Sequence, residues 1–117
     1  MGFKTPTFWD SPKSYKTEAL SDALSGTNTI VAAVSGARIK VYAIHFNVVG
    51  TVNVKWVDGT VGDLTGDMNF QAREGYTNAV TPPAFLLATS AGEALVLNLS
   101  AAIAIDGWIA YWDDDAT

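Results

Sequence analysis

The chain has 117 residues, of which 49% are hydrophobic and 16% charged, and it carries a net charge of −5. This length suits one domain with one core, and the absence of cysteine excludes a disulfide framework and a cysteine-based zinc site. Because so few side chains are charged, apolar atoms must contribute to the surface, and we expect part of that surface to contact another subunit.

Charge is distributed unevenly along the chain. Lys4, Lys13 and Lys16 lie near the N-terminus, whereas no Lys or Arg follows Arg73. A nucleic-acid groove requires clustered positive charge on the folded domain, so we expect no nucleic-acid partner. The N-terminus lacks the pattern of a signal peptide, and no apolar run reaches the roughly 20 residues that span a bilayer. We therefore expect synthesis as a soluble cytoplasmic protein and no membrane partner.

Residues 1–16 predict an extended N-terminal arm. Pro6 and Pro12 interrupt regular structure, and the hydrophobic side chains follow no sustained period. Aromatic side chains such as Phe8 and Trp9 either pack on the chain's own domain or dock on a neighbouring subunit or partner. Docking is considered because buried aromatic side chains dominate interface energetics. Both interpretations stay open.

From residue 17 onward the sequence predicts short β-strands separated by Gly, Pro or Asn. Residues 17–24 predict a strand or an irregular segment, since eight residues form only a marginal helix. Further strands are expected at residues 29–34, 38–49, 51–57, 67–72, 76–80, 85–88, 94–99 and 103–112. About eight short antiparallel strands predict a single all-β domain over residues 17–117, either a β-sandwich or a jelly-roll-like fold.

The longest predicted strand contains a change of phase. Ile39 and Val41 share one face of an extended chain, whereas Ile44 and Phe46 occupy the opposite parity. A β-bulge near Tyr42-Ala43, or burial on both faces, would reconcile the two patterns.

Glycine marks two further features of the strand pattern. The Asp58-Gly59 pair between β-rich runs predicts a hairpin across residues 51–64. Gly107 lies inside the last predicted strand, where we expect it to bend the chain.

His45 is the only histidine, and it lies in the middle of a predicted strand. A general base needs a nucleophile and an orienting carboxylate, and no Gly-x-Ser-x-Gly or similar nucleophile motif accompanies it. We therefore favour a structural or interface role for His45 and expect no enzymatic activity and no cofactor. An ion bound by three copies of His45 on a symmetry axis is the alternative.

Aspartates follow two patterns. Asp58, Asp63 and Asp67 lie in Gly-rich turns and have the oxygen ligands that calcium prefers, but their spacing matches no EF-hand loop. Solvated turn aspartates are the favoured interpretation, and no metal site is expected. The acidic run at residues 113–115 predicts a frayed, solubilising end.

Aromatic residues suggest a binding surface in the second half of the chain. Five of them could form a platform for a sugar ring, or the core and a protein interface: Trp56, Tyr76, Trp108, Tyr111 and Trp112. In the last strand, Trp108 and Trp112 have the parity opposite to that of Ile109 and Tyr111, so one pair must face away from the core. We expect Trp108, Tyr111 and Trp112 to form an oligomer or partner surface, with protein contact favoured over sugar.

Several segments between residues 27 and 111 also resemble a known family. They are Thr-Ile-Val-Ala-Ala-Val-Ser-Gly at 29–36, Arg-Ile-Lys-Val at 38–41, Leu-Thr-Gly at 64–66, and the run from Ala-Gly-Glu-Ala-Leu to Asn-Leu-Ser-Ala-Ala at 91–102. In these segments the chain resembles small virion proteins of tailed bacteriophages, of the head decoration (cement) or head-fibre type. The resemblance implies a non-enzymatic β-sandwich or jelly-roll module that assembles, commonly as a homotrimer, on the outside of a capsid.

The resemblance therefore leads us to expect a capsid decoration protein that binds the major capsid protein at the virion surface. The arm lies outside the shared segments. We expect Phe8 and Trp9 to anchor it across a subunit boundary, with Lys4, Lys13 and Lys16 facing acidic surface. The alternative is an adhesion module of a phage fibre or tail that binds host glycan through exposed aromatic residues.

Overall fold

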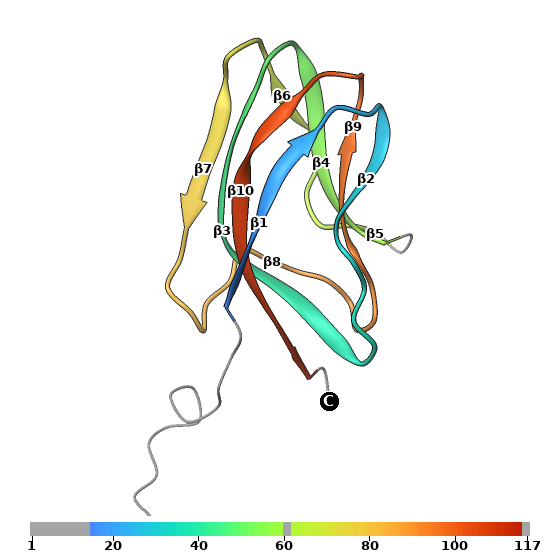
Figure 1. The fold of residues 1–117 in the computed structure, drawn as a ribbon, viewed down its shortest axis with the longest axis vertical. Helices are drawn as coiled ribbons and strands as arrows, with labels where there is room; N and C mark the ends of the chain where they lie inside the picture. Colours follow the sequence, from blue (N-terminus) through green and yellow to red (C-terminus); the bar gives the residue numbers. More distant parts are fainter. Residues whose placement is uncertain (1–14, 60–61, 116–117) are drawn as a thin grey trace, which may run out of the picture.

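The computed structural model describes residues 15–59 and 62–115, in which all regular elements are β-strands. One antiparallel sheet contains β1 (Lys16–Asp22), β10 (Ile105–Asp115), β3 (Ala37–Val48), β7 (Gly75–Ala79) and β8 (Leu87–Ala88). The other contains β2 (Gly26–Val31), β9 (Leu95–Leu99), β4 (Val52–Asp58), β5 (Gly62–Asp63) and β6 (Met68–Phe70). The all-β prediction is confirmed, and the two facing sheets are consistent with the predicted sandwich (Figure 1). No helix in these ranges is long and apolar enough to cross a bilayer.

The order of the strands brings the two ends of the described chain together. The first sheet has the order β1-β10-β3-β7, with β8 also pairing with β3. The second has the order β2-β9-β4-β5, with β6 also pairing with β4. The strands β1 and β10 therefore lie side by side in one sheet, as Figure 1 shows in blue and red.

The strand assignment differs from the predicted one in several places. The described residues form ten strands rather than about eight, because β1 is a regular strand and β5 is a separate element of two residues. The first strand begins at Lys16, which the sequence assigns to the arm. The second strand covers Gly26–Val31 instead of residues 29–34, because the pairing with β9 ends at Val31 and leaves Val34 39% exposed in the following loop.

The change of phase in the longest strand is a β-bulge, as predicted. In the pairing of β10 with β3, Ala110 lies opposite Ala43 and Tyr111 lies opposite Val41, so Tyr42 is the extra residue. One extra residue exchanges the two faces of a strand, because successive side chains point to opposite sides. As a result Val41 and Ile44 both reach the core, with exposed fractions of 0% and 3%.

The space between the sheets is filled with aliphatic and aromatic side chains. Trp56, Phe46 and Ile39 are among the largest fully buried ones. Phe46 meets Phe70 of the other sheet edge-to-face, with 5.4 Å between the ring centroids. The predicted hairpin is also present, since β4 pairs with β5 through Val57 with Asp63 and Asp58 with Gly62.

Gly107 lies where β10 approaches β3 most closely. A Cβ atom at this position would overlap the His45 carbonyl oxygen and would lie 2.6 Å from the Phe46 Cα. The register between the strands continues without a shift at Gly107, so the glycine serves close backbone approach rather than a bulge.

We expect Gly107→Ala to lower the free energy of unfolding by about 1–3 kcal/mol, because the added methyl group must separate two paired strands. Urea denaturation of the purified protein measures this change. Gly66→Ala is the matched control, since a Cβ at Gly66 meets no atom within 4 Å. A variant at Gly107 that is as stable as the control would contradict the close approach.

Candidate functional site

Trp108 is an exposed aromatic side chain on the outer face of the first sheet. It projects from β10 with 43% of its surface exposed. In the sheet it lies between Ala19 of β1 and His45 of β3, and His45 in turn pairs with Thr77 of β7. The predicted outward-facing aromatic is therefore present at Trp108, and three neighbouring strands position the residues beside it.

His45 lies next to Trp108 and is held in place by a hydrogen bond. Its ring centroid is 5.9 Å from that of Trp108, and its Nδ1 lies 2.7 Å from the Thr77 hydroxyl oxygen. Among the described residues no carboxylate hydrogen-bonds to the other ring nitrogen. The arrangement orients an exposed histidine against an aromatic ring, which favours the structural or interface role predicted for His45.

The surface around Trp108 has small side chains and carries little charge. The neighbouring positions on this face of the sheet have small side chains: Thr17, Ala19, Ala43, Thr77, Ala79 and Ala110. Two residues further along each strand, the next row of cross-strand neighbours consists of Ser21, Asp106 and Asn47. Asp106 is therefore the charged residue nearest to Trp108 along β10. We call Trp108, His45 and these small residues the Trp108 face.

Tyr111 and Trp112 do not belong to the exposed surface that the sequence predicts. Tyr111 is 7% exposed and packs between the sheets, and burial raises the pKa of its hydroxyl. Trp112 has the same parity as Trp108 but is only 1% exposed. It is covered by Tyr15 and Tyr42, whose ring centroids lie 5.9 and 5.8 Å away. Only Trp108 of the three predicted residues remains available to a partner.

The acidic run at the end of β10 is part of the sheet, not a frayed end. Asp113 forms an ion pair of 3.0 Å with Lys16, and Asp114 forms one of 3.2 Å with Lys40. The hydrogen bond and the charge of Asp113 raise the pKa of Lys16. Lys16 is thus already engaged within the domain. The other predicted arm residues lie outside the described part of the chain: Lys4, Phe8, Trp9 and Lys13.

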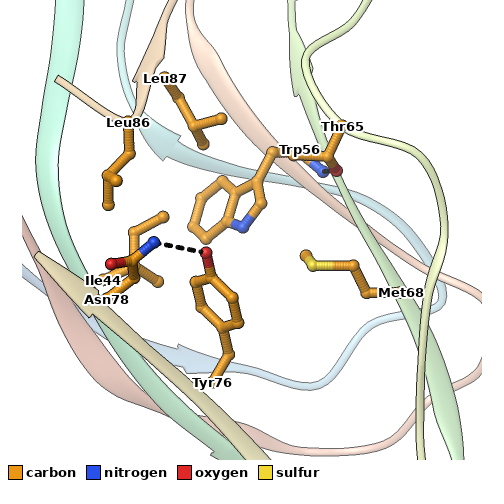
Figure 2. A pocket seen from close by; sticks show the side chains of 8 residues that line it. All are labelled: Ile44, Trp56, Thr65, Met68, Tyr76, Asn78, Leu86 and Leu87. Atoms are coloured by element: carbon orange, nitrogen blue, oxygen red, sulfur yellow. Dashed lines mark hydrogen bonds between the residues drawn. The ribbon is translucent and has the colours of Figure 1, made fainter.

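Trp56 and Tyr76, which the sequence assigns to a platform or to the core, line an internal pocket. Trp56 comes from β4 and is 1% exposed, whereas Tyr76 comes from β7 and is partly buried. Figure 2 shows the two side chains directed toward one another between Leu86 and Met68. A sugar ring cannot stack on the buried face of Trp56, so these residues do not form the open platform.

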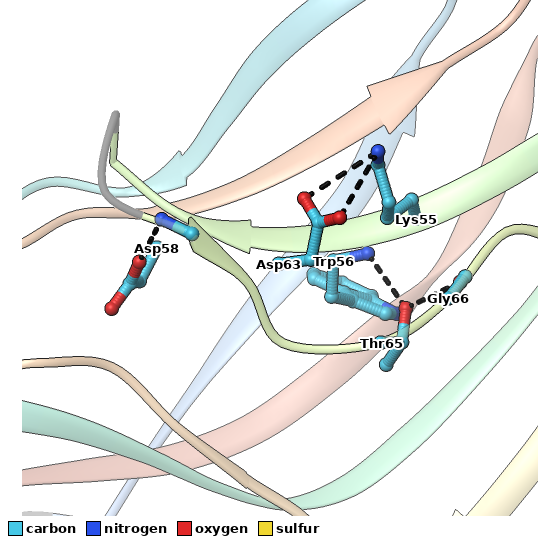
Figure 3. A network of polar contacts seen from close by, with 7 residues as sticks. Lys55, Trp56, Asp58, Asp63, Thr65 and Gly66 are labelled. Carbon is cyan, nitrogen blue, oxygen red and sulfur yellow. Dashed lines mark hydrogen bonds and ion pairs between the residues drawn. The ribbon is translucent and has the colours of Figure 1, made fainter.

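Asp58 is a buried structural carboxylate, not a solvated turn residue. It is 4% exposed, and its two oxygens accept hydrogen bonds from the backbone N–H groups of Gly62 at 2.9 Å and Ser90 at 3.0 Å. Burial acts to raise its pKa, but the hydrogen bonds from Ser90 and Gly62 outweigh burial and lower it. Figure 3 shows one hydrogen bond to the Asp58 carboxylate, near the contacts of Lys55 with Asp63 and of Trp56 with Thr65. Asp58 therefore joins the β4–β5 hairpin to the loop before β9.

The other turn aspartates do not assemble with Asp58 into a calcium site. Asp63 pairs with Lys55 at 3.4 Å, as Figure 3 shows, and Asp67 is exposed. Within residues 15–59 and 62–115 no three carboxylate, histidine or cysteine side chains lie close enough together to hold a metal ion. The carboxylates of Asp58, Asp63 and Asp67 therefore do not form one site.

Comparison with known proteins gives no match: no family model, no curated protein and no solved structure is significantly similar to this chain.

We expect Asp58→Asn to lower the free energy of unfolding by about 1–3 kcal/mol at pH 7, because an amide nitrogen replaces one of two accepting oxygens. The native pKa of Asp58 lies below its unfolded value, so the ionised carboxylate stabilises the fold above about pH 4. This stabilisation declines as the pH falls through the native pKa, so the difference between variant and wild type should shrink in acid.

Urea denaturation at a series of pH values measures both effects. Asp63→Asn is the control, since the Asp63 side chain is 60% exposed and its ion pair should contribute less than about 1 kcal/mol. A stability difference at Asp58 that stays constant into acid would contradict the role of its charge.

Proposed function

We propose that this protein is a non-enzymatic structural component of a phage virion that decorates the head and stabilises the shell. The observation that carries the proposal is the Trp108 face, where one large aromatic side chain stands 43% exposed on a surface of small residues. Such a surface suits a protein partner, because a buried Trp contributes strongly to an interface and small neighbours permit close approach. The resemblance of residues 29–41 and 91–102 to head decoration proteins points to the same class.

The jelly-roll form of the sandwich is part of this proposal. The connections β1 to β2, β2 to β3 and β3 to β4 each cross from one sheet to the other, and so do those from β8 to β9 and β9 to β10. When β5 and β6 are counted as one strand beside β4, and β7 and β8 as one strand beside β3, the two sheets together contain eight strands. This order supports a jelly roll, an architecture found in viral capsid and lectin domains.

We assign the Trp108 face to contact between copies of this chain, in a homotrimer. Lys and Arg are absent from the rows that flank Trp108, so little charge has to leave water when two such faces meet. The N-terminal arm is then available for the major capsid protein, with Phe8 and Trp9 as anchors and Lys4 and Lys13 near acidic surface.

The proposed mechanism is mechanical. A protein that binds the assembled shell but not its separate subunits stabilises the shell by mass action. Three arms on one trimer make the second and third contacts intramolecular, which raises the overall affinity without any new type of contact. The fold then serves to hold the arms at a defined spacing.

We expect gold-labelled antibody against this protein to decorate the heads of intact virions in electron micrographs. The virions are purified from the lysate in which the protein is detected, and virions treated with pre-immune serum are the control. Label at the tail or fibre tips would contradict the proposal and favour host adhesion. Absence of label on any virion part would exclude a surface role on the particle.

We expect Trp108→Ser to convert the trimer to a monomer without loss of fold, because Trp108 is exposed in the single chain. Sedimentation velocity measures the oligomeric state, and thermal unfolding checks the fold. Leu24→Ser is the matched control, since Leu24 is 69% exposed in the loop after β1, away from the Trp108 face. A wild type that sediments as a monomer, or a Trp108 variant that stays trimeric, would contradict this assignment.

A further inference from the structure

A pocket lies between the two sheets, separate from the Trp108 face. Its volume is about 180 Å³, and eight residues line it: Ile44, Trp56, Thr65, Met68, Tyr76, Asn78, Leu86 and Leu87. Cavities of about 150 Å³ with apolar walls bind benzene, so this space is large enough for a small organic molecule. The residues come from both sheets and from the segment before β8, as Figure 2 shows.

The floor of the pocket contains an unsatisfied hydrogen-bond donor. The indole Nε1 of Trp56 is buried and has no hydrogen-bond partner in the described part of the chain. The backbone N–H of the same residue does have one, because it donates to the Thr65 hydroxyl at 3.1 Å. Buried polar groups are nearly always hydrogen-bonded, so an unpaired indole N–H on a residue that lines a cavity indicates a missing acceptor.

A second donor lies beside the first. The Tyr76 hydroxyl accepts a hydrogen bond from the Asn78 side-chain amide at 3.2 Å, which leaves its own proton available for donation. Figure 2 shows this bond and the Tyr76 hydroxyl turned toward the Trp56 ring. Two donors therefore converge on one apolar space, the arrangement that ligand pockets use to orient a bound molecule.

We propose that this pocket binds a small neutral organic molecule that has an aromatic or branched apolar body and one hydrogen-bond acceptor. The walls formed by Ile44, Leu86 and Leu87 match the apolar body, and Trp56 and Tyr76 match the acceptor. The ligand is neutral because none of the lining residues is charged, so a buried carboxylate or ammonium group would have no counter-charge.

Met68 is the side chain that adapts when the ligand enters. The Trp56 Nε1 has almost no accessible surface, so an acceptor reaches it only after a neighbouring side chain moves. Met68 lines the pocket and is partly buried, and an unbranched thioether changes rotamer more readily than Leu86 or Ile44. The proposal is independent of virion binding, because it concerns the interior of a single chain.

We test the proposal with acetophenone and ethylbenzene, two probes of similar shape of which only the first has a carbonyl acceptor. Nitrogen-15-labelled protein is titrated with each probe, and the indole N–H resonances are followed by two-dimensional NMR. We expect a saturable shift confined to the Trp56 indole, with acetophenone binding about fivefold more tightly than ethylbenzene, as one hydrogen bond of ordinary net strength predicts.

Two variants assign the effect to the pocket. Trp56→Phe retains an aromatic ring but removes the indole donor, so the preference for acetophenone should shrink to the part that the Tyr76 hydroxyl supplies, while ethylbenzene still binds. Tyr76→Phe removes the second donor at a partly buried position and should reduce the preference, and thermal unfolding checks both variants. Equal affinity of the wild type for both probes, shifts spread over all the indoles, or no saturable binding would each overturn the proposal. The probe comparison on the wild type remains decisive if Trp56→Phe does not fold.

Discussion

The structure depends on the pairing of β3 with β10, and in particular on the bulge in that pairing. The two strands run side by side from Val48 opposite Ile105 to Ala37 opposite Asp115. The extra residue Tyr42 exchanges the two faces of β3 in the middle of this ladder. Without it, either the residues before the bulge or those after it would direct their apolar side chains to solvent. The bulge thus allows one long strand to contribute to the core along its whole length.

The alternation that follows from this register separates the two surfaces of the sheet. His45 and Trp108 are directly opposite each other and both point outward, where they form the centre of the Trp108 face. Their neighbours Ile44 and Ile109 are also opposite each other but point inward, with exposed fractions of 3% and 0%. The proposed partner surface and the packed interior are therefore made by adjacent residues of the same two strands.

Local patterns in the sequence predicted the features that depend on one strand. The phase change near Tyr42 and the opposite parities of Trp108 and Tyr111 can both be seen without knowledge of neighbours, because they follow from a period of two. The burial of Trp112 could not be predicted, since it is covered by Tyr42 of β3 and by Tyr15, which precedes β1. The burial of Asp58 could not be predicted either. Its local sequence is typical of a solvated turn, and only the distant loop that contains Ser90 makes it a buried hydrogen-bond acceptor.

The pocket could not be predicted from local patterns at all, since its walls come from segments that lie far apart in the chain. Trp56 is an ordinary core residue by its period, and only the orphaned indole N–H distinguishes it. Residues 44 and 45 of β3 point to opposite faces, so Ile44 lines the pocket whereas His45 lies on the Trp108 face. A substitution at Trp108 thus changes the outer face and leaves the pocket unchanged. A substitution at Trp56 or Tyr76 changes the pocket and leaves the outer face unchanged. The proposed self-association and the proposed ligand binding can therefore be tested separately by single substitutions.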